Sequence, residues 1–180
     1  GGGLDRGAGV LLVGPCGRAV GQAGTSEPIR RSAVTRPPVA VVRRVLPAPP
    51  HVVFDEWLDP VGMTEWMCPR PARAVKIALE PVVGGALRID IEDSAASLYV
   101  TGRFIELDRP RRLRFSWTCS DWADPTVQSE VTVTLEDHGQ DQTLMTIEHE
   151  QLPAGQADPH QRGWGAIAVQ LGEALDTRSG

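Results

Sequence analysis

The stretch LPAPPHVVFDEWLDP, residues 46–60, contains the end of a strand, a corner stiffened by prolines and a short apolar helix. Pro60 disfavours continuation of this helix past its second turn. Two turns of helix are not stable alone, yet these carry four large apolar side chains: Val53, Phe54, Trp57 and Leu58. The helix must therefore lie against a larger apolar surface, which the rest of the chain has to supply.

Around this stretch the chain alternates between apolar and polar residues. The alternating segments are residues 39–46, 72–79, 86–93, 97–108, 111–118, 129–137 and 142–152. In the second of them, Val75, Ile77 and Leu79 are expected to share one face. Alternation of this kind is typical of an antiparallel sheet with one face in water. We therefore predict about seven antiparallel strands.

The last segment has a helical period instead. In residues 159–176 the apolar positions recur as a single stripe: Trp164, Ile167, Ala168, Leu171 and Leu175. The predicted fold class is α+β, with the sheet curved around this long C-terminal helix. A second short helix is expected over residues 61–67. Both short helices follow the first strand, and helix 50–58 is expected to close the end of the curled sheet.

Composition separates the chain into two parts. Residues 1–38 are rich in Gly, Arg, Ser and Pro without any period, so we predict a disordered extension or a misassigned start. Residues 39–178 form the predicted domain. Residues 1–36 carry five Arg against one Asp and one Glu, a net +3, which leaves −8 for the remainder of a chain of net charge −5. A domain this acidic is poorly suited to a phosphate backbone, so no nucleic-acid partner is expected.

The cysteines and the hydropathy bear on localisation. There are three cysteines, an odd number with no close spacing: Cys16, Cys68 and Cys119. This argues against a disulfide framework and favours a reducing compartment. No apolar run approaches the roughly 20 residues that a membrane-spanning helix needs. We expect a cytoplasmic protein without a membrane partner.

Several stretches at normal spacing carry a family resemblance. They are residues 46–60 with Trp66 shortly after, Gly84-Gly85 before a strand, TGRFIELDRPRRLRFSW at 101–117, residues 131–153, and HQRGW at 160–164. Together they span about residues 40–175. In this combination the domain resembles the SRPBCC (START/Bet v 1-like) superfamily, and most closely its branch of heat-shock-protein ATPase activator homologues (AHSA-type).

The resemblance implies a helix-grip fold with an apolar cavity between the curved sheet and the C-terminal helix. Members of the superfamily bind lipids, hormones, polyketides and other hydrophobic small molecules, and some catalyse reactions or act on chaperones. Binding of a hydrophobic small molecule is therefore the first hypothesis. The alternatives are a hydrolase or cyclase acting on a hydrophobic substrate, and a chaperone ATPase co-factor.

Six residues are candidates for the ligand site. Trp66, Trp117 and Trp164 lie on three elements that should converge on the cavity, where indole rings would form rigid walls. Met145 faces inward if the alternation of its strand holds, and His149 then does the same. His149 is either a hydrogen-bonded structural histidine or a donor or general base in the pocket.

Arg103 is the sixth candidate. If Ile105 and Leu107 face inward, strict alternation places Arg103 inward as well, where its guanidinium would need a carboxylate from the protein or from an acidic ligand. Alternatively, a bulge at Gly102 turns Arg103 outward.

Motifs for catalysis are missing. The four histidines lie on different elements, and the chain contains no HExxH, CxxC or GxSxG sequence. No catalytic residue, metal site or cofactor is therefore predicted, and a binding protein is favoured over an enzyme.

Overall fold

The computed structural model describes residues 39–94 and 96–179. The extension predicted over residues 1–38 lies outside this part. The elements, in chain order, are β1 (Ala40–Leu46), α1 (Pro50–Glu56), the 3₁₀ helix η1 (Gly62–Glu65), β2 (Arg73–Leu79), β3 (Ala86–Glu92), β4 (Ser97–Asp108), β5 (Arg112–Cys119), β6 (Ser129–Gly139), β7 (Gln142–Glu150) and α2 (Ala157–Ser179).

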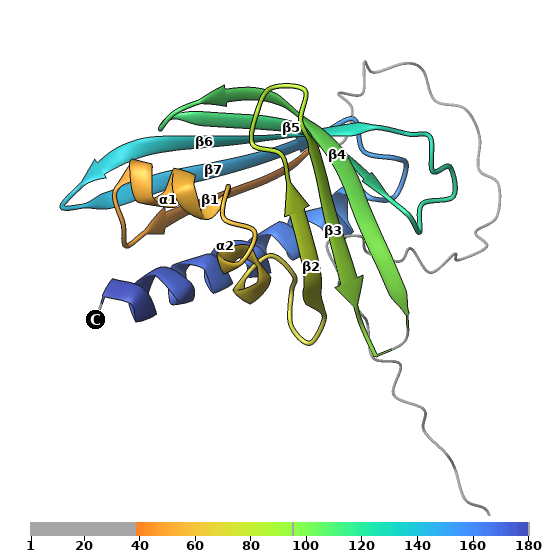
Figure 1. Ribbon diagram of the computed structural model, residues 1–180, viewed down its shortest axis with the longest axis horizontal. Helices are drawn as coiled ribbons and strands as arrows, with labels where there is room; N and C mark the ends of the chain where they lie inside the picture. Colours follow the sequence, from red (N-terminus) through yellow and green to blue (C-terminus); the bar gives the residue numbers. More distant parts are fainter. Residues whose placement is uncertain (1–38, 95, 180) are drawn as a thin grey trace, which may run out of the picture.

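The strands form one antiparallel sheet of seven strands in the order β1-β7-β6-β5-β4-β3-β2. Figure 1 shows the sheet curling over α2, which runs along its concave side. The first two strands are therefore the two opposite edges of the sheet, and α1 and η1 carry the chain from one edge to the other. The prolines of the 46–60 stretch fix the direction in which the chain leaves β1. The predicted α+β helix-grip fold, with two short helices after the first strand, is confirmed.

Helix α2 supplies one wall of the core. All five residues of its predicted stripe are buried: Trp164, Ile167, Ala168, Leu171 and Leu175. Val53, Phe54 and Trp57 of the 46–60 stretch are buried in the same core. The large apolar face of the short helix is thus covered by the sheet and by α2, as its composition required.

Two glutamines tie α2 to the rest of the fold through backbone groups. The buried side chain of Gln170 accepts a hydrogen bond from the N–H of Arg70 (3.0 Å) and donates to the carbonyls of Trp66 (3.1 Å) and Cys68 (2.7 Å). The exposed Gln161 bonds both the N–H and the carbonyl of Val41 on the edge strand β1. Gln170 therefore anchors the segment after η1, and Gln161 covers part of a sheet edge.

We expect Gln170→Leu to lower the free energy of unfolding by about 2 kcal/mol, because three backbone groups lose their partner while the side-chain volume is kept. Urea denaturation measures this loss. The matched control is Gln161→Leu, whose backbone partners lie at an exposed edge that water can reach, and it should cost under about 1 kcal/mol. Equal losses in the two variants would contradict the anchoring role of Gln170.

One face assignment in β2 is wrong. The register of β2 against β3 shifts between Ala74 and Lys76, so an extra residue interrupts the alternation. Val75, predicted inward, is 43% exposed, whereas Ala74 is buried and Ile77 and Leu79 remain partly buried against the core. A bulge of this kind turns the residues on its two sides in different directions.

The hydropathy of the helices and the state of the cysteines bear on the expected localisation. No helix in the described part of the chain is long and apolar enough to cross a membrane. Cys68 is a buried free thiol, whose pKa burial raises to about 12. Cys119 is disulfide-bonded, a bond that the prediction from cysteine number and spacing did not anticipate.

Candidate functional site

The concave side of the sheet holds a continuous cluster of aromatic rings. The ring centroids of Trp57 and Trp66 lie 5.1 Å apart, those of Trp117 and Trp164 lie 5.2 Å apart, and Trp57 lies 6.2 Å from Trp164. Phe115 packs between Trp57 (6.1 Å) and Trp117 (6.3 Å). The three predicted tryptophans do converge, but on one another. At the place where the sequence predicts a cavity between the sheet and α2, the indole rings of Trp117 and Trp164 pack against each other.

A small apolar hollow lies beside this cluster. Its volume is about 10 Å³, room for about one water molecule. The lining residues come from α1 and η1 with their flanks and from the sheet: Trp57, Met63, Met67, Leu79, Leu87, Ile89, Phe104, Phe115 and Trp117. None of them belongs to α2, so this hollow lies beneath α1 and η1, whereas the sequence predicts a cavity between the sheet and α2.

Most residues of the hollow were missing from the predicted site. Of the six candidates only Trp117 lines it, while Trp66 lies edge-on against Trp57 and Met145 is buried in β7 away from it. Met63 and Met67 both fall within the second short helix predicted over residues 61–67, and in the structure Met63 belongs to η1 while Met67 follows it. Their apolar character was readable from the sequence, but nothing in the periodicity shows which strands that helix covers.

His149 is held by a chain of hydrogen bonds. The indole N–H of Trp164 donates to Nδ1 of His149 (3.0 Å), so the imidazole proton sits on Nε2 and points to Oγ of Ser129 (2.7 Å). The Ser129 hydroxyl in turn donates to the carbonyl of Trp117 (2.9 Å). Both ring nitrogens are thus occupied within the protein, which leaves no lone pair for proton transfer to a ligand.

A second buried histidine faces the first. The rings of His149 and His160 are 4.9 Å apart and perpendicular, and Nδ1 of His160 donates to the carbonyl of Gln156 (2.8 Å). Desolvation lowers the pKa of His149 well below 6.5, and the neighbouring His160 lowers it further. Desolvation also lowers the pKa of His160, to about 4, although its bond to Gln156 acts in the opposite direction. Both imidazoles are therefore neutral near pH 7.

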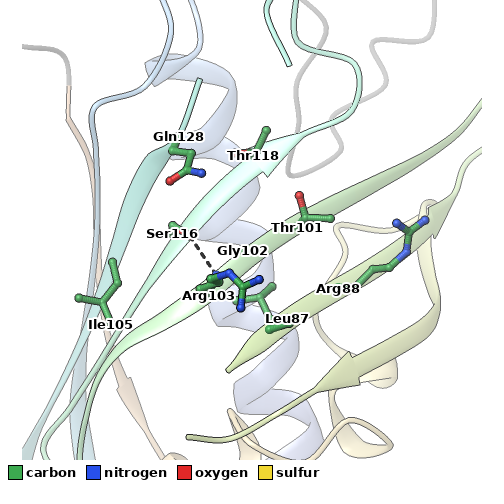
Figure 2. Close-up of a pocket in the computed structure, with 10 residues that line it drawn as sticks. Leu87, Arg88, Thr101, Gly102, Arg103, Ile105, Ser116, Thr118 and Gln128 are labelled. Carbon is green, nitrogen blue, oxygen red and sulfur yellow. Dashed lines mark hydrogen bonds between the residues drawn. The ribbon is translucent and has the colours of Figure 1, made fainter. Parts of the chain in front are cut away.

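Arg103 lies on the outer face of the sheet, apart from the other five candidates. Figure 2 shows it beside Ser116, whose hydroxyl oxygen accepts a hydrogen bond from the Arg103 N–H (2.9 Å). Its guanidinium donates to the carbonyl of Gly84 (2.9 Å). The predicted inward direction of Ile105 is wrong, because the bulge in β4 falls between Phe104 and Glu106 and leaves Ile105 39% exposed.

Glycine is required at position 102 for close approach. A Cβ atom there would lie 1.8 Å from the carbonyl oxygen of Ser116 on β5. The two strands come together at this point on one side of a groove of about 580 Å³ on the outer face. An enzyme using His149 and Arg103 together is not supported, since the first is buried against α2 and the second faces solvent across the sheet.

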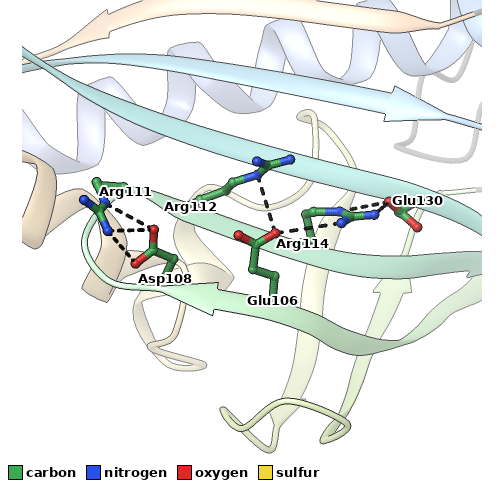
Figure 3. A network of polar contacts seen from close by, with 6 residues as sticks. All are labelled: Glu106, Asp108, Arg111, Arg112, Arg114 and Glu130. Atoms are coloured by element: carbon green, nitrogen blue, oxygen red, sulfur yellow. Dashed lines mark hydrogen bonds and ion pairs between the residues drawn. The ribbon is translucent and has the colours of Figure 1, made fainter.

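The outer face also carries a network of charges. Glu106 of β4 lies 3.6 Å from the guanidinium of Arg112 and 3.8 Å from that of Arg114, and Arg114 also pairs with Glu130 of β6 (Figure 3). Partly exposed pairs of this kind contribute little to stability individually. The network identifies this side as the solvent-exposed face of the sheet.

A curled antiparallel sheet closed around a long C-terminal helix, with short helices bridging its two edges, defines a helix-grip protein. Within that class the chain belongs to the family described as "Activator of Hsp90 ATPase homolog 1-like protein", whose profile matches residues 47–176. No curated protein matches the chain.

Solved structures share this fold. A protein from Chromobacterium violaceum is 24% identical, with a TM-score of 0.69 over 77% of this chain and 97% of that one. An HSP90 activator from Plasmodium falciparum is 22% identical, with a TM-score of 0.57 over 70% and 86%. DynU16, a protein in the dynemicin biosynthetic locus, is 19% identical, with a TM-score of 0.62 over 78% and 48%. At these identities the similarity establishes the fold alone.

Proposed function

We propose that the protein binds a hydrophobic small molecule in the hollow beneath α1 and η1. The observation that carries this proposal is the lining, which consists of apolar and aromatic side chains drawn from both the sheet and the bridging segment. Sites for small molecules are typically concave and apolar. Met63 and Met67 form the side of the hollow next to η1, and methionine adapts its shape to different ligands.

Binding requires the hollow to widen, because ligand sites usually measure about 300–1,000 Å³ and this one measures about 10 Å³. In this proposal the part that moves is the bridging segment, which consists of α1, η1 and their flanks and joins β1 to β2. It is held to α2 by the hydrogen bonds of Gln170 and by ion pairs that are exposed or partly exposed, Arg178 with Glu65 (2.8 Å) and Arg70 with Glu173 (3.1 Å). Exposed pairs cost little to break. Outward movement of η1 would open the hollow while the sheet stays intact.

The test is a thermal melt in the presence of hydrophobic probes, here palmitate, cholesterol and 1-indanone. A ligand present at 100 times its dissociation constant adds about 2.7 kcal/mol to the free energy of unfolding, so the melting temperature should rise. Met63→Trp fills the hollow and should abolish the rise. The control, Val61→Trp, lies at a position 77% exposed and should retain it. If no probe raises the melting temperature of the unmodified protein, the proposal fails.

A second candidate function is that of a chaperone ATPase co-factor. The family description and the HSP90 activator from Plasmodium falciparum favour it. We expect purified Hsp90 from the same organism to hydrolyse ATP faster when this protein is added. An unchanged rate at saturating protein would eliminate this candidate and leave ligand binding unaffected.

A further inference from the structure

Three indole N–H groups in the aromatic cluster lack an acceptor in the part of the chain that the structure describes. They belong to Trp57, Trp66 and Trp117, whose side chains are buried. Buried donors almost always have a partner in folded proteins, so each exception calls for an explanation. Trp164 in the same cluster donates to His149, which shows that this fold can supply an acceptor to a core indole.

Two of the three donors belong to rings that line the same small space, and the third belongs to a ring packed against one of them. Trp57 and Trp117 both line the hollow, and Trp66 packs edge-on against Trp57 with ring centroids 5.1 Å apart. The remaining lining side chains are aliphatic, phenyl or thioether groups. Two of the lining rings, those of Trp57 and Trp117, therefore carry a hydrogen-bond donor without an acceptor, and the lining side chains include neither a carboxylate nor an amide, hydroxyl or cationic group.

Such surroundings select a particular ligand chemistry. An ionised ligand would find no counter-charge among the lining side chains, and burial of an unpaired charge is strongly unfavourable. A ligand with O–H or N–H groups would find only the weak acceptors of the two methionine sulfurs. A neutral ligand with carbonyl or ether oxygens would instead accept hydrogen bonds from the unpartnered indoles.

We infer that the hollow binds a neutral apolar molecule that carries hydrogen-bond acceptors and no donors, such as an aromatic ketone. This inference rests on the proposed function and specifies its ligand class. The indoles provide the selectivity, and the apolar lining provides the contact area.

Two probes with one ring skeleton test the inference: 1-indanone, which has a carbonyl, and indane, which does not. We expect 1-indanone to bind at least tenfold more tightly than indane in a titration followed by NMR of indole-¹⁵N-labelled protein. The indole N–H signals of Trp57, Trp66 or Trp117 should move with 1-indanone and stay in place with indane. The Trp164 signal should remain unchanged, because its proton is already bonded to His149.

Trp117→Phe keeps an aromatic ring but removes one donor. It should weaken 1-indanone binding while leaving indane binding unchanged, and Trp57→Phe provides the same comparison if the first variant does not fold. The control is Trp122→Phe, because Trp122 does not line the hollow and packs against His160 instead. It should preserve the preference for 1-indanone.

The outcomes separate this inference from the proposed function. Equal affinity for 1-indanone and indane would overturn the inference and leave hydrophobic binding in place. Tight binding of palmitate in preference to 1-indanone would do the same. Failure of every probe to bind would overturn both.

Discussion

A chain that stops at Pro159 is expected not to fold. The deletion removes the whole buried stripe of α2, in which Trp164, Ile167, Leu171 and Leu175 are at most 3% exposed. Burial of four such side chains contributes about 6–12 kcal/mol, comparable with the roughly 5–15 kcal/mol by which a domain is stable. It also removes Gln170 and Gln161, so backbone groups of the 66–70 segment and of the β1 edge lose their partners.

Circular dichroism and thermal melting measure this effect. The truncated chain should show no cooperative transition, whereas the full chain should show one. A chain that stops at Asp176 is the control, because it keeps the stripe and loses the ion pairs of Arg178 with Glu56 and Glu65 and the hydrogen bond from Thr177 to the carbonyl of Glu173. It should keep a cooperative transition, because the buried stripe of α2 remains and the contacts that are lost lie at the end of the helix. A cooperative melt in the chain ending at Pro159 would refute the structural role of α2.

Periodicity was sufficient to predict the architecture. The stripe from Trp164 to Leu175 recurs with the period of a helix, and the alternation in β7 has the period of a strand. These two periods differ enough to be recognised directly in the sequence. The apolar face of the 46–60 stretch also required a large apolar surface to pack against, although the stretch itself does not show which elements form that surface. These features are local, so the sequence contains them in full.

The two bulges could not be predicted in the same way. Val75 and Ile105 are apolar residues at positions where strict alternation turns them inward, yet both are exposed. The register shifts that turn them outward depend on how β2 pairs with β3 and β4 with β5. Gly102 did indicate an irregularity nearby, but the close approach to Ser116 that requires glycine becomes apparent only in three dimensions.

The site was predicted only as a set of converging aromatic residues. Trp66, Trp117 and Trp164 do meet on the concave side, but sequence does not reveal whether large side chains line a space or fill it. That depends on the distance between α2 and the sheet. The same distance determines that His149 reaches Trp164 of α2, whereas the pairing of β6 with β7 brings it to Ser129.

Acidification from pH 6.5 to pH 4 is expected to destabilise the fold strongly through the buried histidines. The pKa of His160 is about 4 in the folded protein, whereas an imidazole in the unfolded chain titrates near 6.5. Below pH 6.5 the unfolded state therefore binds a proton that the folded state does not, and the free energy of unfolding falls. The loss from His160 reaches about 3 kcal/mol at pH 4 and then levels off. His149, whose pKa is also lowered, adds to it.

Urea denaturation at pH 7.5, 6, 5 and 4.5 measures this dependence. His160→Gln removes one titrating group, so the variant should be less stable at pH 7.5 but should lose less stability on acidification than the unmodified protein. His51→Gln is the matched control, because His51 is exposed and should leave the slope unchanged. If His160→Gln retains the full acid slope, groups other than this buried imidazole cause the loss. The assignment of the acid-induced loss to His160 would then be abandoned.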